Sequence, residues 1–277
     1  MCELSLREIQ QEALKVLLRF DTICKQYGFK YFLIYGTLLG AVRHNGFIPW
    51  DDDLDVMMPR EDFDRFNKYA KANEEALMPF KLCDRANTKN YVYGIPRFAN
   101  TEFIYEVQSK YEKPFDLGTF IDIYPLDNFG NNYKEATLLW KHCNLLNRKF
   151  GWYVNPSSSR GAFVTFIKRL LHSYMRIFKG NEYEKYVDED IRNYIMSHTS
   201  LENRYVGLVV WNWRVLLYDK TCVEELDTIG HVFEGYKFPI PKCYDYLLKL
   251  SYGDYMQLPP KEKRIPHHNY KIYRPRN

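Results

Sequence analysis

The chain is 277 residues long, 46% of its residues are hydrophobic, and its net charge is +4. This length and hydrophobic content fit one large domain, or a domain with an appended helical lobe, and we find no low-complexity tract. The mildly basic balance suits an anionic substrate but does not indicate nucleic-acid binding, so we expect no nucleic acid partner.

The six cysteines are scattered along the chain without a C-x-x-C pair, which argues against structural zinc. We find no secretory signal and no apolar run of membrane-spanning length. Reduced thiols in a cytoplasmic protein are therefore the simplest interpretation.

The first 46 residues predict a helix, a strand and a second, short helix. Residues 5–27 carry apolar side chains at helical spacing, which indicates an amphipathic helix. The following elements are a buried strand, a Gly-Thr strand end, a short helix and an Asn-Gly turn, at residues 31–35, 36–37, 38–44 and 45–46.

Glycine at the end of the predicted strand allows the backbone to approach a phosphate closely. The hydroxyl of Thr37 and the amides of the helix that follows Gly36 would then bind that anion.

Four aspartates lie within five residues, at positions 51, 52, 53 and 55. Leu54 and the apolar residues 56–58 are typical of the start of a buried strand. Because alternate side chains of a strand share a face, Asp53 and Asp55 should point the same way and form a site for Mg²⁺ or Mn²⁺. A solvated turn or a helix N-cap is the alternative interpretation of such a cluster.

Downstream, the patterns predict a helix at residues 60–72 and strands at residues 81–83, 91–98 and 102–107. A further apolar strand, residues 118–127, is interrupted by Asp122. A buried unpaired charge is expensive, and metal coordination would offset its cost. Alternatively, backbone amides or an arginine hold this carboxylate.

Residues 133–227 are predicted to be mainly helical, with a loop or linker at residues 155–159. A strand at residues 231–238 and a helix at residues 244–250 follow. Within this region, residues 160–179 combine a wide apolar stripe with five basic side chains. Such a helix either lies on an anionic membrane surface or packs in a core with a solvated basic face.

The segment from Tyr35 to Asp55, YGTLLGAVRHNGFIPWDDDLD, closely resembles the LicD family of phosphotransferases within the nucleotidyltransferase superfamily. Thr37 replaces the Gly or Ser that is usual in the superfamily. Two further blocks are similar to the family, namely the strand aspartate with Pro-Leu-Asp in 118–127 and the segment 233–268 with Tyr-Gly-Asp-Tyr-Met and Leu-Pro-Pro. Residues 131–225 match only loosely.

The resemblance implies an α+β fold, with a nucleotidyltransferase-like mixed sheet core flanked by helices and a mainly helical C-terminal region. We expect a single LicD-like domain over residues 1–277. Its αβ core would span residues 1–130, and a mainly helical lobe at 131–277 would return to that core.

The resemblance also implies metal-dependent transfer of a phosphoalcohol, above all phosphocholine from CDP-choline, to a sugar hydroxyl. The acceptor would be a cell-surface glycan, lipopolysaccharide or teichoic acid precursor, free or lipid-linked. Alternatives are transfer of ribitol phosphate or phosphoethanolamine, true nucleotidyl transfer that releases pyrophosphate, and a non-catalytic protein that binds a nucleotide or glycan. The location would be cytoplasmic, with peripheral contact at the inner membrane face if residues 160–179 bind lipid.

The predicted site follows from the motifs and the resemblance together. The catalytic and metal-binding residues are Asp53, Asp55 and Asp122, and the metal is Mg²⁺ or Mn²⁺. The predicted donor and phosphate contacts are Gly36, Thr37, Arg43, His44 and Arg97. Asp51, Asp52, His267 and His268 are further positions that could contribute.

Overall fold

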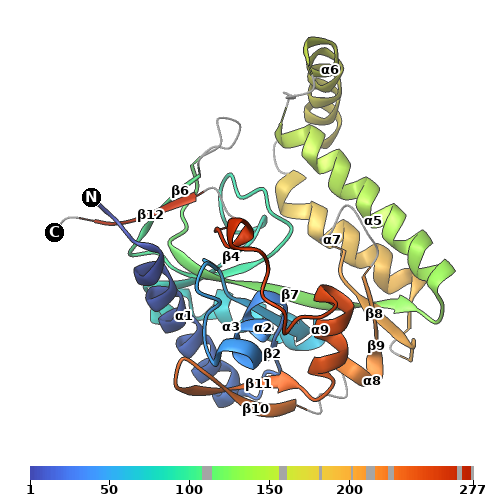
Figure 1. The fold of residues 1–277 in the computed structure, drawn as a ribbon. Helices are drawn as coiled ribbons and strands as arrows, with labels where there is room; N and C mark the ends of the chain where they lie inside the picture. Colours follow the sequence, from blue (N-terminus) through green and yellow to red (C-terminus); the bar gives the residue numbers. More distant parts are fainter. Residues whose placement is uncertain are drawn as a thin grey trace.

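The computed structural model describes residues 1–107, 114–155, 161–180, 183–200, 202–209, 216–223, 228–266 and 270–275. A mixed sheet lies at its centre, with strand order β2-β3-β7-β5-β4 (Figure 1). These strands are β2 (Phe32–Leu33), β3 (Asp55–Pro59), β4 (Phe80–Cys83), β5 (Arg97–Asn100) and β7 (Thr119–Gly130). β3 and β7 are parallel, and the other pairs in this row are antiparallel. The fold is therefore α+β, as predicted.

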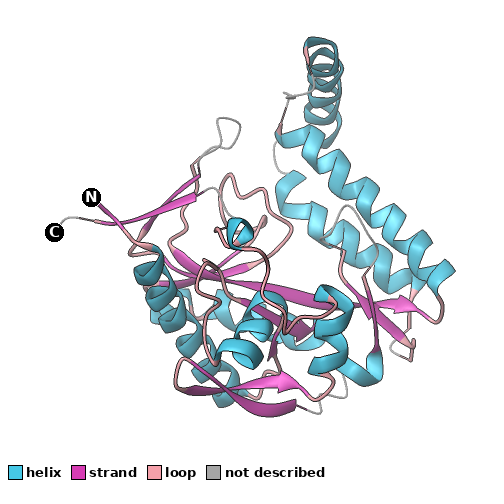
Figure 2. Cartoon of the chain, viewed as in Figure 1, coloured by secondary structure: helices cyan, strands magenta, loops and turns pink. Residues whose placement is uncertain are grey.

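Strands β3 and β7 are buried along most of their length, in keeping with their apolar sequences. Helices α1 (Leu6–Tyr27) and α3 (Arg60–Ala72) pack against this sheet, and Figure 2 shows the helices that flank it. The predicted helices at 5–27 and 60–72 are thus confirmed. The ends of α1 are fixed locally: Ser5 and Glu8 form a capping box, and Gly28 ends the helix in a left-handed conformation.

The element after β2 differs from the prediction. Helix α2 spans Tyr35–His44, and the amide of Leu38 donates to the carbonyl of Ile34 (3.0 Å), so the helix begins before Gly36. The expected strand at 31–35 is therefore wrong at its end, and only Phe32–Leu33 pairs with β3. As a result Gly36 lies in the first helical turn rather than in a strand end.

Two predicted strands were misplaced. The expected strand at 91–98 pairs only from Arg97 onward, because Pro96 has no amide to donate to a ladder. The expected strand at 231–238 is a hairpin of β10 (Thr228–Phe233) and β11 (Tyr236–Pro241). Its two turn residues, Glu234 and Gly235, both have positive φ, which suits a two-residue hairpin turn.

The region after β7 contains the long helices α5 (Tyr133–Val154), α6 (Ala162–Lys179) and α7 (Tyr183–His198). The prediction of a mainly helical segment missed β8 (Tyr205–Gly207) and β9 (Leu217–Asp219), which extend the central sheet from the end of β7. The predicted loop at 155–159 lies almost wholly outside the described residues. The core interpretation of α6 is wrong, because its apolar stripe is exposed.

The remaining elements close the fold. A small sheet joins β1 (Cys2–Glu3), β12 (Tyr270–Arg274) and β6 (Ile104–Val107), and so brings both ends of the chain together. The short helices are α4 (Glu74–Leu77), α8 (Lys220–Val223), α9 (Tyr244–Tyr252) and the 3₁₀ turn η1 (Lys261–Lys263). Within the described ranges, no helix has the length and apolar character needed to cross a membrane.

Candidate active site

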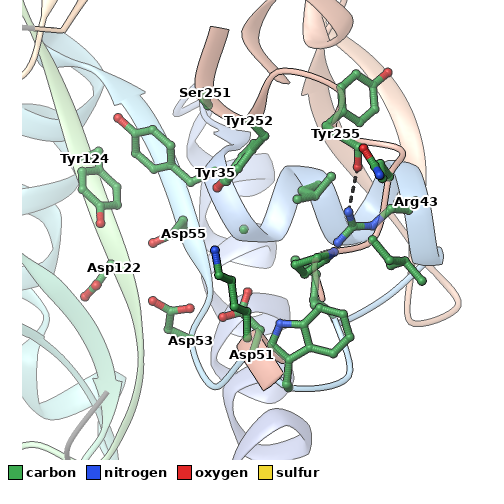
Figure 3. A pocket seen from close by; sticks show the side chains of 18 of the residues that line it. Tyr35, Arg43, Asp51, Asp53, Asp55, Asp122, Tyr124, Ser251, Tyr252 and Tyr255 are labelled. Atoms are coloured by element: carbon green, nitrogen blue, oxygen red, sulfur yellow. Dashed lines mark hydrogen bonds between the residues drawn. The ribbon is translucent and has the colours of Figure 1, made fainter. Parts of the chain in front are cut away.

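The three predicted carboxylates meet at the start of the parallel strand pair. Asp55 is the first residue of β3 and lies opposite Asp122 of β7 in the strand register. Asp53 is two residues earlier, on the loop that leads into β3. Oxygens of the three side chains all lie within 4.8 Å of one another, and Figure 3 shows the carboxylates facing a shared space. This separation allows one divalent cation to contact all three.

Electrostatics favour a cation at this place. Asp55 is 6% exposed, and its Oδ1 has no hydrogen-bond partner among the described residues. Burial raises the pKa of Asp55 well above its usual value, and the charges of Asp53, Asp122 and Asp51 raise that pKa further. An orphaned buried carboxylate oxygen beside two other carboxylates fits the preference of Mg²⁺ or Mn²⁺ for oxygen ligands.

Arg97 is paired with the third carboxylate. Its Nε donates to Oδ1 of Asp122 (2.7 Å), and both side chains are buried. The guanidinium lies over the rings of Tyr93 and Phe120, 4.5 and 4.1 Å from their centroids. An arginine therefore holds Asp122, as one alternative proposed, while Asp122 also joins the acidic cluster. Nη1 of Arg97 has no partner among the described residues, and the side chain lines the cavity.

The start of α2 shapes the acidic loop. A Cβ added to Gly36 would lie 2.6 Å from Oδ2 of Asp51, so only glycine fits without displacing that carboxylate. Oγ1 of buried Thr37 accepts a hydrogen bond from the amide of Asp55 (2.7 Å), which ties α2 to β3. Thr37 therefore helps to position Asp55. Gly36, unlike Thr37, lines the cavity.

Arg43 and His44 form a pair at the end of α2. Nε of Arg43 donates to Nε2 of His44 (2.9 Å), and Nη1 donates to the carbonyl of Tyr255 (2.7 Å). Burial lowers the pKa of both side chains, and the Arg43 charge lowers the His44 pKa further. His44 is thereby held in the neutral form that accepts a hydrogen bond. Arg43 lines the cavity.

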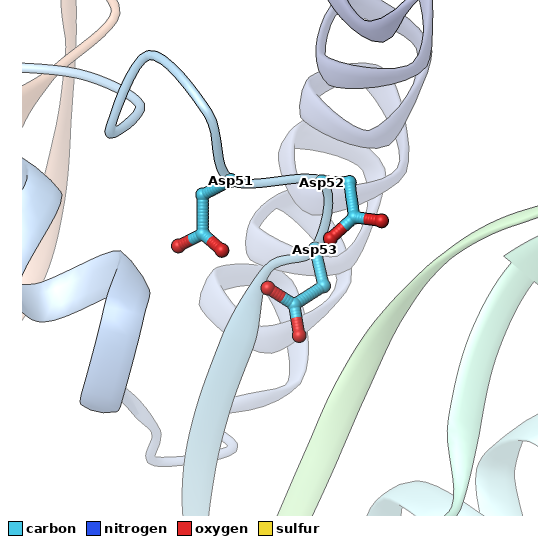
Figure 4. A group of neighbouring side chains, drawn as sticks. All are labelled: Asp51, Asp52 and Asp53. Carbon is cyan, nitrogen blue, oxygen red and sulfur yellow. The ribbon is translucent and has the colours of Figure 1, made fainter. Parts of the chain in front are cut away.

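Asp51 and Asp52 precede the cluster on a fixed loop, shown with Asp53 in Figure 4. Oxygens of these three side chains also lie within 4.8 Å of one another. The loop is held through its carbonyls, because Gln10 donates to that of Asp51 and Tyr270 to that of Asp52, both at 2.8 Å. His267 and His268 lie outside the described residues.

Asp127 lies in β7 and accepts two hydrogen bonds from Arg60, at 2.7 and 2.6 Å. It is buried on the same strand as Asp122 but does not belong to either acidic trio found among the described residues.

The carboxylates open into a cavity of about 980 Å³ whose wall includes side chains that sequence reasoning missed. Its aromatic lining consists of Tyr35, Trp50, Tyr93, Tyr124, Tyr252 and Tyr255. Tyr124 follows Asp122 by two residues on β7 and hydrogen-bonds Asp55, so strand alternation could have identified it. Most residues of the Pro-rich segment at 252–260 also line the cavity.

The sequence is similar to a known family and to several known proteins. Residues 28–162 match the model of the LicD/FKTN/FKRP nucleotidyltransferase domain family. Over 284 positions, covering 99% of both chains, the sequence is 28% identical to the lipopolysaccharide cholinephosphotransferase LicD of Haemophilus influenzae. An uncharacterised protein of Rickettsia typhi is 34% identical over 112 residues, which are 37% of this chain and 34% of that protein. A second uncharacterised protein, from Rickettsia prowazekii, is 64% identical over 33 residues, 12% of each chain.

Proposed function

Because the chain belongs to the LicD family, we propose that this phosphotransferase moves phosphocholine from a CDP-linked donor to a sugar hydroxyl. The observation that carries the proposal is the meeting of Asp53, Asp55 and Asp122 at one end of a cavity. The full-length similarity to a lipopolysaccharide cholinephosphotransferase supports phosphocholine as the group and lipopolysaccharide as the acceptor. Another cell-surface glycan or a teichoic acid precursor is the alternative acceptor.

Asp53, Asp55 and Asp122 would hold Mg²⁺ or Mn²⁺, which when bound neutralises charge on the donor diphosphate. Gly36 lines the cavity and has no side chain of its own, so its backbone is a proposed contact for the donor phosphates. Arg43 and Arg97 line the same cavity and are the proposed contacts for phosphate oxygens.

In the proposed reaction the acceptor hydroxyl oxygen attacks the phosphorus that bears choline. The new bond joins that oxygen to phosphorus, the bond from phosphorus to the CMP oxygen breaks, and CMP leaves. Asp122 is the proposed acceptor of the hydroxyl proton, because it lines the cavity beside Asp55, its partner in the strand register.

The aromatic lining supports choline over uncharged phosphoalcohols. A quaternary ammonium is attracted by the faces of Tyr and Trp rings, whereas ribitol has no cation to offer them. Tyr35, Tyr252 and Trp50 line the cavity together with the acidic residues, so a cationic headgroup would meet both rings and negative charge. Phosphoethanolamine carries a smaller, strongly hydrated ammonium and is the nearest alternative.

The test is incubation with CDP-choline, CDP-ethanolamine and CDP-ribitol plus Mg²⁺ or Mn²⁺ and a glycan acceptor, with nucleotide products separated by chromatography. We expect CMP release that is fastest with CDP-choline and is stopped by EDTA. Asp53→Ala and Asp55→Ala should each lower turnover by about 10³-fold or more. Near-wild-type turnover in either variant would refute the assignment of these carboxylates.

True nucleotidyl transfer is the second candidate, favoured by the description of the matching family as a nucleotidyltransferase domain. It would use the same three aspartates but release pyrophosphate from a nucleoside triphosphate. Product analysis separates the two reactions. Nucleotide binding that calorimetry finds to be independent of metal, with no product of either kind, would instead indicate a non-catalytic binding protein.

A further inference from the structure

Helix α6 projects from the body of the molecule (Figure 1) and buries only Met175 of its eighteen residues. Its large apolar side chains are mostly exposed, to 76% for Phe163 and for Ile177. The main members of this exposed apolar stripe are Phe163, Phe166, Ile167, Leu170, Ile177 and Phe178. A contiguous apolar face of this kind marks an interaction surface.

Two polar side chains of α6 contact helix α5. Arg176 Nη1 donates to the hydroxyl of Tyr153 on α5 (2.9 Å), and His172 Nδ1 lies 3.2 Å from the carbonyl of Trp152. At 100° per residue the stripe members fall within an arc of about 120° on the other side of the helix. The apolar stripe therefore points away from the rest of the protein, whereas the apolar side of a surface helix normally packs against the core.

Charge is concentrated in the same part of the chain. Residues 133–179 contain nine Lys or Arg and one acidic residue, Glu135, which gives this segment +8. The whole chain is only +4, so all other residues together carry −4. On the exposed surface of α5, Leu138 and Leu145 lie near Lys141 and Lys149 at helical spacing.

We propose that α6, together with the basic surface of α5, docks on an anionic lipid surface. The apolar stripe would enter the boundary between headgroups and acyl chains, and the lysines and arginines would attract the anionic headgroups. An amphipathic helix that lies in the interface needs no spanning length, in keeping with the described helices. This surface deepens the proposed function, since a lipid-linked acceptor would be held in the same plane as the enzyme.

A second copy of this chain is a less favourable partner for the apolar stripe of α6. Pairing two α6 stripes around a twofold axis would bring the +8 segments of both copies together, and juxtaposed like charges oppose association. An anionic membrane instead supplies the opposite charge across a wide plane. Charge complementarity thus favours lipid.

The test is co-sedimentation of the purified protein with vesicles of phosphatidylcholine, with or without phosphatidylglycerol. We expect binding to the anionic vesicles that weakens in high salt. Phe163→Glu combined with Ile177→Glu should lower the partition coefficient about 10-fold or more. The matched control, Val232→Glu with Tyr236→Glu, changes two exposed apolar residues on the distant β10–β11 hairpin and should bind as wild type does.

A charge variant, Lys141→Glu with Arg169→Glu, should remove the preference for anionic vesicles. The proposal is overturned if wild type does not bind phosphatidylglycerol vesicles, or if the stripe variant binds them unchanged. It is also overturned if sedimentation velocity finds a dimer that the stripe variant dissociates. CMP release with a water-soluble acceptor should be unchanged in all these variants, so loss of vesicle binding is distinguishable from failure of the proposed reaction.

Discussion

Replacing Asp55 with Asn separates two effects of the clustered carboxylates: their mutual repulsion, which lowers the stability of the fold, and their proposed binding of a metal. Burial, and then the charges of Asp53, Asp122 and Asp51, raise the pKa of Asp55 in the folded protein. A carboxyl group with a raised folded pKa stabilises the fold below its unfolded pKa of about 3.9 and loses that contribution as pH rises through the folded value. Each unit of elevation costs about 1.4 kcal/mol of stability once the group is ionised.

The asparagine side chain that replaces Asp55 does not ionise, so the variant lacks this pH-dependent cost. Without metal, the variant should therefore unfold at higher urea concentration than wild type at pH 8, with the difference disappearing toward pH 4. Saturating Mn²⁺ should reverse the order: wild type gains about 2.7 kcal/mol at 100 times its Kd, and the variant gains little. The assay is urea unfolding followed by circular dichroism, with EDTA or with Mn²⁺.

Asp127→Asn is the matched control, because Asp127 is also buried on the central sheet but is paired with Arg60. Removing this carboxylate should cost about 2 kcal/mol, since charged hydrogen bonds are lost, and should leave the Mn²⁺ stabilisation in place. The reasoning is wrong if Asp55→Asn is less stable than wild type in EDTA at pH 8 and retains the full Mn²⁺ stabilisation.

Three further substitutions test how the site is held. Gly36→Ala should displace the Asp51 carboxylate and lower turnover about 10²-fold in steady-state assays, with the fold intact by circular dichroism. Thr37→Val leaves a buried amide without its acceptor and should cost about 1–3 kcal/mol in urea unfolding, whereas Thr37→Ser should not. Arg97→Met leaves buried Asp122 without its cation and should destabilise the metal-free protein by about 3–5 kcal/mol, measured in the same way; unchanged stability would contradict the ion pair.

The sequence was informative where the signal is local. Helix α1 is marked by Ser5 and Glu8 at one end and Gly28 at the other, so its bounds could be predicted closely. Asp53, Asp55 and Asp122 stood out because charges rarely occur within apolar strands unless something compensates for them. Their meeting in the structure follows from the parallel pairing of β3 with β7.

Long-range contacts were the part that local patterns could not predict. Arg43 reaches the carbonyl of Tyr255, 212 residues away, and so places the segment after α9 against the cavity. Nothing in the local composition of residues 252–260 indicates that contact. The start of α2 was predicted wrongly for a related reason. Tyr35 is aromatic, which is typical of a strand residue, but the helix begins at Tyr35, whose φ is positive.

The register of the central sheet explains how negative charge gathers at the proposed metal site. Asp55 lies opposite Asp122, and Asp122 lies opposite Arg97, so two acids and one base form a row across β3, β7 and β5. With Asp53 added, three negative charges meet the one positive charge of Arg97, which leaves −2 when all are ionised. A proton on Asp55, whose pKa is raised, would relieve only part of this repulsion, whereas one divalent cation would balance all of it. Arg97 therefore sets the local charge as well as the position of Asp122.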